Sequence, residues 1–219
     1  MSLATDLQTV STAAVSQLDP LWTVDNADQL ESAMWDVLPG LVDQWSLAAS
    51  AVAADWYDTQ REQAGAPGAF QAIVEPMAEL GVGALIGWAM EPVRQPTPDF
   101  AAAQYRAVGG VQKRVINSAN YTITGSSKAD PHAKGWVRRT RPDGCDFCRM
   151  VASNDRLYTE AAATFACHER CHCYAEPLWG GQQVDVRPYT PSQRTSSMSD
   201  AQRSAMNRQA HAWIKANLK

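Results

Sequence analysis

The chain is 219 residues long, with 45% hydrophobic and 19% charged residues, a composition that excludes an intrinsically disordered protein and allows a buried core. No apolar run reaches the roughly 18–20 residues that a membrane span needs, so no membrane partner is expected. The first ten residues also lack the basic and apolar regions of a signal peptide, and secretion is therefore not predicted.

The net charge of −4 conceals two halves of opposite sign. Residues 1–100 carry 14 acidic and 2 basic side chains, whereas residues 101–219 carry 9 acidic and 17 basic side chains. Opposite signs indicate surfaces that meet different partners, or each other, and a basic half is able to face nucleic acid. Two solvated faces without a partner explain the same distribution equally well.

Helical patterns run through the first half of the chain. The spacing predicts an opening helix over residues 3–18, which ends before Pro20. A second helix is predicted from Asp28 to Leu38, because Pro39 cannot continue the hydrogen-bond ladder. A long third helix is predicted to follow. Its apolar residues recur at steps of three and four and share one face: Leu41, Trp45, Ala48, Val52 and Trp56.

Two starts marked by proline predict the next helices. Pro76 is placed as the first residue of a helix over residues 76–90, whose small residues permit close helix contacts. A proline-rich connector follows, and Thr97 then acts as the N-cap of another helix that ends near residue 127. The first half is therefore predicted to be one helical domain.

Strand and turn signals replace the helical pattern after that point. The segments 135–140 and 173–179 are typical of short strands, and Pro142-Asp143-Gly144 is a turn signal. Residues 182–198 are rich in Ser, Thr and Pro, which is typical of a linker. The predicted domains are a helical domain (1–127), a small module (128–181), a polar linker (182–198) and a C-terminal basic helix (199–219).

All five cysteines lie between positions 145 and 173, a cluster that argues against a disulfide framework. The spacing is Cys145-x2-Cys148, then 19 residues, then His168-x2-Cys171-x-Cys173. A C-x-x-C turn presents two sulfurs to one ion, and Zn²⁺ in structural sites prefers four thiolate or imidazole ligands in a tetrahedron. The pattern therefore predicts a closed structural zinc site, with Cys171 or Cys173 completing it. The predicted fold is mainly α: an N-terminal helical domain, a small zinc-stabilised α+β module and a C-terminal helix.

A second metal pattern overlaps the first. His168-Glu169-Arg170-Cys171-His172 fits H-E-x-x-H, in which two histidines bind zinc on a helix and Glu169 is the general base of a peptidase. Pro177 in a strand-like run and the nearby cysteines, which compete for the metal, argue against this interpretation. We therefore expect His172 to point to solvent and Cys167 to be a small buried thiol.

Three segments of the C-terminal half carry a family resemblance: GWVRRTRPDGCDFCRMVAS, LYTEAAATF and HERCHCYAEPLW. Over residues 135–179 they resemble the C-terminal zinc module of MuF-like phage head proteins. The N-terminal part, with WSLAASAVAADWYDTQREQAG, is similar in texture to actinobacteriophage members, in which a helical domain precedes the module. The positions that carry over as metal-site residues are Cys145, Cys148, His168, Cys171 and Cys173.

The resemblance implies a minor capsid or head-morphogenesis protein of the virion head, made in the bacterial host cytoplasm and incorporated in few copies. Its implied partners are the phage portal protein and the major capsid or scaffold protein. Actinobacteriophage members are often labelled capsid maturation protease, which is the enzymatic alternative. A third hypothesis is contact with packaged DNA, motivated by Arg138, Arg139, Arg141 and the basic C-terminal helix.

Overall fold

A computed structural model describes most of the first 180 residues and a few positions beyond them. The described residues are 2–141, 143–153, 157–158, 165, 168–170, 173–180, 199, 201, 205, 208 and 212. The predicted linker lies outside the described residues. So do Cys167, Cys171 and His172, and the roles predicted for them stay predictions. Within the described part of the chain, no helix combines the length and the apolar character that crossing a membrane requires.

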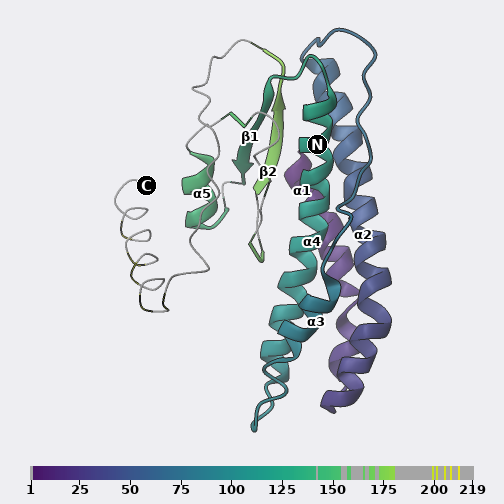
Figure 1. Ribbon diagram of the computed structural model, residues 1–219, viewed down its shortest axis with the longest axis vertical. Coiled ribbons are helices and arrows are strands. Elements are labelled where there is room, and N and C mark those ends of the chain that lie inside the picture. Colours follow the sequence, from purple (N-terminus) through teal and green to yellow (C-terminus); the bar gives the residue numbers. More distant parts are fainter. Residues whose placement is uncertain are drawn as a thin grey trace.

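Long helices form the body of the molecule (Figure 1). They are α1 (Leu3–Ser16), α2 (Ala27–Gln63), α3 (Val82–Met90) and α4 (Phe100–Ala129), and the 3-10 helix η1 (Asp19–Thr23) follows α1. α2 and α4 lie side by side along the long axis, and both α1 and α3 pack against them. Apolar side chains from all four helices meet in one core, which confirms the mainly helical fold.

α2 is one unbroken helix of 37 residues, so the predicted interruption at Pro39 is wrong. Proline lacks the N–H that donates to the carbonyl one turn earlier, which costs about 3 kcal/mol in a helix interior. Leu38 and Val42 on either side of it are fully buried, and this tertiary packing offsets the cost. The buried stripe is also rotated from the predicted one, and its centre is formed by Val42, Ala49, Ala53 and Tyr57.

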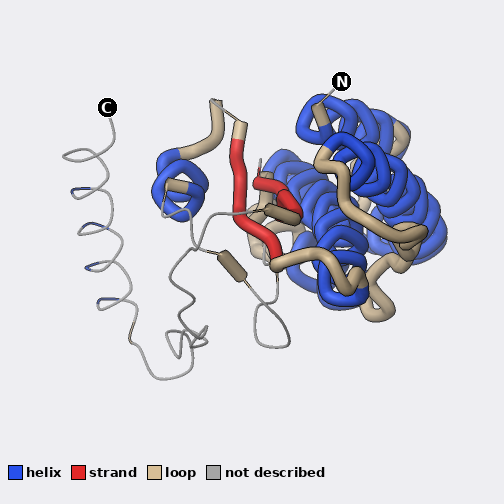
Figure 2. The backbone as a smooth tube through the Cα atoms, turned by 90° about the horizontal axis from the view of Figure 1, so that it is seen from above, coloured by secondary structure: helices blue, strands red, loops and turns tan. Residues whose placement is uncertain are grey.

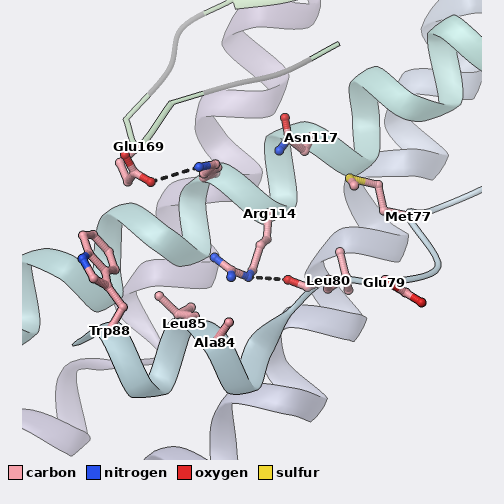
Figure 3. A pocket seen from close by; sticks show the side chains of 10 residues that line it. Met77, Glu79, Leu80, Ala84, Leu85, Trp88, Arg114, Asn117 and Glu169 are labelled. Atoms are coloured by element: carbon pink, nitrogen blue, oxygen red, sulfur yellow. Dashed lines mark hydrogen bonds and ion pairs between the residues drawn. The ribbon is translucent and has the colours of Figure 1, made fainter. Parts of the chain in front are cut away.

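α3 begins at Val82 and not at Pro76, as the proline suggested. Gly81 precedes it with a left-handed backbone, φ 59°, which a right-handed helix cannot contain. The chain before α3 is held from α4 instead, because the guanidinium of Arg114 donates to the carbonyls of Leu80 and Gly81. Figure 3 shows this arginine reaching the segment from α4.

α4 is capped by Asp99 and not by the predicted Thr97. The Asp99 carboxylate accepts a hydrogen bond from the amide of Ala102 at 2.8 Å. A negative charge at a helix N-terminus also interacts favourably with the helix dipole, an advantage that a threonine hydroxyl lacks.

A pair of antiparallel strands packs on the helical body, and both strands were predicted. β1 (Gly135–Thr140) pairs with β2 (Cys173–Leu178), with Gly135 opposite Leu178. Seen from above, the pair lies between α4 and the short helix α5 (Asp146–Ala152), as Figure 2 shows.

The strands share the core of the helices. Alternate residues of β2 point inward, and the side chains of Cys173 and Ala175 are 2% and 0% exposed. The amide of Ala175 donates to the side-chain oxygen of Asn120 in α4 at 2.7 Å. Trp136 of β1 joins the same apolar cluster. One core therefore continues across the domain boundary predicted at residue 127.

A buried polar cluster closes the end of α4. Asp130 follows the last helical residue, and its side chain is 0% exposed. Its Oδ2 accepts hydrogen bonds from Arg61 at 2.9 Å, from Trp179 at 2.8 Å and from Tyr57 at 3.3 Å. Its Oδ1 accepts from the amide of His132 at 3.0 Å. One carboxylate thus joins α2, the end of α4 and the residue that follows β2.

Candidate metal centre

Two cysteines and a histidine predicted as ligands come together at one point. Sγ of Cys148 lies 3.1 Å from Nε2 of His168, and Sγ of Cys145 lies 3.4 Å from the same nitrogen. All three potential ligand atoms lie within 4.8 Å of one another. Zn–S and Zn–N bonds of about 2.3 and 2.0 Å in a tetrahedron place neighbouring ligand atoms roughly 3.5 Å apart. The group therefore has the size of a metal site.

The start of α5 explains why both sulfurs face the same point. Cys145 is the N-cap of this helix, and Cys148 lies in its first turn. The amide of Cys148 donates to Sγ of Cys145 at 3.4 Å. Cys145 is exposed and Cys148 is buried, so an ion held between them lies at the edge of the core. The sequence predicted the C-x-x-C pair but not the helix that orients it.

The backbone of the next residue orients His168. Its Nδ1 lies 2.6 Å from the carbonyl oxygen of Glu169, so Nδ1 carries the proton that it donates. The lone pair of Nε2 then faces the two sulfurs. The ring of Phe147 packs edge-on against the imidazole. Metal-binding histidines usually donate their second ring nitrogen in this way, so the residues present fit a metal ion.

Cys173 lies apart from this group. Its side chain belongs to the core and lines a small cavity with Leu7 of α1 and Ile116 of α4. Among the described residues, the group of potential ligands is Cys145, Cys148 and His168. Cys171, the other predicted fourth ligand, lies outside the described residues. The identity of the fourth ligand stays a prediction.

Comparison with known proteins places the chain in a family. A family model described as VG15 protein matches residues 2–201. The chain belongs to the VG15 protein family. Membership makes it a phage virion-associated protein, which confirms the expectation of a phage protein. No curated protein and no solved structure matches the chain.

In this VG15-family protein, the turn that carries His168 is fastened to α4. Oε1 of Glu169 accepts a hydrogen bond from Nζ of Lys113 at 3.0 Å (Figure 3). The guanidinium carbon of Arg170 lies 3.4 Å from the ring centroid of Tyr105. The same guanidinium donates to the Tyr105 carbonyl at 2.8 Å. A shift of this turn relative to α4 therefore moves His168.

Two glycines let neighbouring segments approach α4 closely. Gly110 faces α3, where a Cβ would overlap the side chain of Leu85. Gly109 faces the turn, where a Cβ would lie 2.9 Å from Nη1 of Arg170 and 3.2 Å from Cβ of Glu169. The arginine end can move aside, but Cβ of Glu169 moves only with its backbone. A methyl group at Gly109 therefore displaces the turn.

We expect Gly109→Ala to weaken zinc binding about 10-fold, because the displaced turn carries a ligand. Competition with a chromogenic chelator measures the affinity. Gly125→Ala in the same helix is the matched control, since its Cβ would meet only Oε2 of Glu75, at 3.9 Å. This control is expected to bind zinc as the wild type does. Equal affinities of the two variants would contradict the role of the turn.

The described part of the H-E-x-x-H pattern is not a helix. Glu169 and Arg170 form a turn, and His168 directly precedes it. The backbone of Arg170 has φ 56°, which interrupts any right-handed helix. Burial disfavours the charge of Glu169, but hydrogen bonds from its own backbone and from Lys113 outweigh burial and lower the pKa of Glu169. A carboxylate held ionised by a lysine is a weak general base. This geometry does not favour the peptidase role.

The three arginines predicted to contact DNA have partners within the chain. Arg138 lies over the ring of Phe165, Arg139 pairs with Glu176, and Arg141 binds Asp143 and Gln8. DNA contact stays a prediction. The logarithm of its binding constant is expected to fall with the logarithm of salt concentration at a slope of about −0.9 per phosphate contact.

Proposed function

We propose that this VG15-family protein is a MuF-like minor capsid protein with a structural zinc site, acting in head morphogenesis at the portal or in the procapsid interior. The observation that carries the proposal is the group of Cys145, Cys148 and His168. Family membership supports the virion setting. The resemblance of residues 135–179 to MuF-like zinc modules supports the role in head assembly.

Zinc in this site acts as a cross-link. α5 has only seven residues and packs mainly on β1, so it buries little apolar surface of its own. An ion bound to Cys145, Cys148 and His168 ties this helix to the turn, and Lys113 ties the turn to α4. Cys171 is our candidate for the fourth ligand, because Cys173 lies in the core.

Zinc content per chain is the first test, measured by elemental analysis on proteins purified side by side. The wild type is expected to hold about one zinc ion per chain, and Cys148→Ser is expected to lose it. Cys173→Ser, which alters a buried cysteine outside the group, is the matched control and is expected to keep the ion. Equal zinc in Cys148→Ser and wild type would refute the site.

Particle composition tests the role in the head. Quantitative mass spectrometry is applied to purified virions and to procapsids that lack DNA. The chain is expected in both particles, at far fewer copies than the major capsid protein. A chain that is found in the lysate but in neither particle would refute the proposal even if it binds zinc.

Capsid maturation protease is the competing function, and one variant separates the two. Glu169→Gln removes the candidate base while the sulfur and imidazole ligands remain. If the protein is structural, co-expressed capsid and scaffold proteins are processed as with the wild type. Cleavage that is lost while zinc is retained would establish the peptidase instead.

A further inference from the structure

Residues 66–81, which connect α2 to α3, contain no helix and no strand. We call this segment the strap, and Figure 1 shows it running along the helices from the end of α2 to the start of α3. None of its residues is buried, and Ile73 and Val74 are 47% and 46% exposed. A connection of this length without secondary structure is uncommon in a compact protein and usually has a function.

Polar side chains of α4 hold the middle of the strap by its main chain. The amide of Ile73 donates to Oγ of Ser126 at 3.0 Å. Oγ1 of Thr122 accepts from the amide of Glu75 at 3.4 Å and donates to the carbonyl of the same residue at 3.0 Å. Water can take the place of each partner when the strap lifts, so one such bond favours the closed strap only about fivefold.

The rest of the strap is held in the same way. The amide of Ala72 donates to Oδ1 of Asp58 in α2 at 2.8 Å. The guanidinium of Arg61 donates to the carbonyls of residues 66–68, at the start of the strap. Arg114 of α4 holds the last two carbonyls at the other end. The helices therefore bind the strap mainly through hydrogen bonds to its main chain.

Little apolar surface fixes the strap. The ring of Phe70 packs edge-on against Tyr57, and Leu80 reaches the core, but neither Phe70 nor Leu80 is fully buried. Gly68 and Gly81, near the two ends, have left-handed backbones with φ 78° and 59°, which glycine adopts without strain. Lifting the strap therefore costs less free energy than unfolding α2 or α4, whose side chains form the core.

We propose that the strap lifts from α2 and α4 as one unit while the helices stay folded, and that the lifted strap is a cleavage site for an endoprotease that accepts apolar residues. Exposed extended chain is the preferred substrate of endoproteases, whereas a helix must first unwind. Ile73 and Val74 supply exposed apolar side chains in such a chain.

Cleavage adds water across one peptide bond of the strap, which leaves a carboxylate on one fragment and an amine on the other. α2 belongs to the first fragment and α4 to the second, and both contribute to one core. The two fragments are therefore expected to stay together. The proposal is independent of the metal site and of the role in the head.

Amide hydrogen exchange in the full-length protein tests the opening. The amides of Ala72, Ile73 and Glu75 are expected to share one free energy of opening, well below that of the amides in the buried part of α4. Their exchange should also depend little on added urea, because lifting the strap exposes little surface. Strap amides that exchange only with the core of α4, or each with a different free energy, would overturn the proposal.

A variant shows whether the strap moves as one unit. Thr122→Val removes both hydrogen bonds to Glu75 and keeps the size of the side chain. Exchange at Glu75 and at Ala72 is expected to accelerate equally, at least about fivefold, although the Ala72 amide is bonded to α2. Thr124→Val is the matched control, since this hydroxyl donates to the carbonyl of Tyr121 in the same helix, and is expected to change neither amide. Acceleration at Glu75 alone would overturn the single unit.

Digestion with thermolysin, which cuts before apolar residues, tests the cleavage site. Within residues 2–129 we expect the first cut in the strap, and the two fragments should elute together in gel filtration. Leu47 is the internal control, because its side chain is 53% exposed but its backbone belongs to α2. Thr122→Val is expected to speed the cut at least about fivefold, since the rate follows the population of lifted strap. A first cut before Leu47, or fragments that separate, would overturn the proposal.

Discussion

Replacing Asp130 by alanine is expected to lower the free energy of unfolding by about 3–5 kcal/mol, because it leaves a buried charge without its partner. The guanidinium side chain of Arg61 is only 7% exposed and pairs with this carboxylate. Tyr57 and Trp179 lose their hydrogen-bond acceptor in the same step. Urea unfolding followed by circular dichroism measures the difference.

An exposed ion pair supplies the control. Glu31→Ala breaks the ion pair between Glu31 and Arg94, in which the Glu31 side chain is 32% exposed and the Arg94 side chain 46% exposed. This substitution is expected to lower the free energy of unfolding by at most about 1 kcal/mol. Similar losses in Asp130→Ala and Glu31→Ala would show that the buried cluster contributes no more than a surface contact.

The same carboxylate makes stability depend on pH. Burial disfavours its charge, but hydrogen bonds from Trp179, the His132 amide and Arg61 outweigh burial and lower the pKa of Asp130. The unfolded chain therefore binds this proton more readily, with a pKa of about 3.9. The contribution of the Asp130 carboxylate to stability is complete above that pH. It is lost as the pH falls through the lower pKa that Asp130 has in the folded protein. Asp130→Asn is expected to flatten the decline of stability below about pH 4.

Chelating zinc from the loaded protein is expected to release α5 and the turn at His168 while the long helices stay folded. At free zinc of about 100 times Kd, the opening that releases the metal is suppressed about 100-fold. Amide hydrogen exchange in α5 should therefore accelerate about 100-fold when the chelator is added. Cys148→Ser is expected to exchange rapidly with or without zinc.

We expect the loss of protection after zinc removal to stop at the strands. From the sequence alone, metal loss is expected to unfold residues near 135–179 and to spare the helices. The structure narrows this expectation, because the Ala175 amide is bonded to Asn120 of α4 and its side chain is fully buried. Ala175 should keep its slow exchange in the chelated protein. Loss of protection at Ala175 together with α5 would show that the metal supports the strands as well.

Periodicity and ligand spacing predicted the features whose causes are local. The long helices and both strands follow from patterns that span a few residues, and the meeting of Cys145, Cys148 and His168 follows from two short ligand motifs 19 residues apart. Pro39 was misread because the compensation for its missing hydrogen bond comes from tertiary burial of Leu38 and Val42. A local rule contains no information about that burial.

The polar cluster at the end of α4 could not be predicted for a related reason. Asp130 is one of 23 acidic residues, and its partners Tyr57, Arg61 and Trp179 are dozens of positions away in the chain. No spacing rule connects them. The burial of Cys173 could be predicted more easily, because alternation along β2 places it on the same buried face as Ala175.

α2 is one unbroken helix, about 55 Å long at 1.5 Å per residue, and this restricts the insertion or deletion of residues within it. One inserted residue within it turns everything beyond by about 100° and carries the buried stripe away from α4. Insertions and deletions among VG15 relatives should therefore be rare inside α2 and α4. They should collect in the connection from Ala64 to Gly81, where added chain loops outward and leaves the register of the two long helices intact.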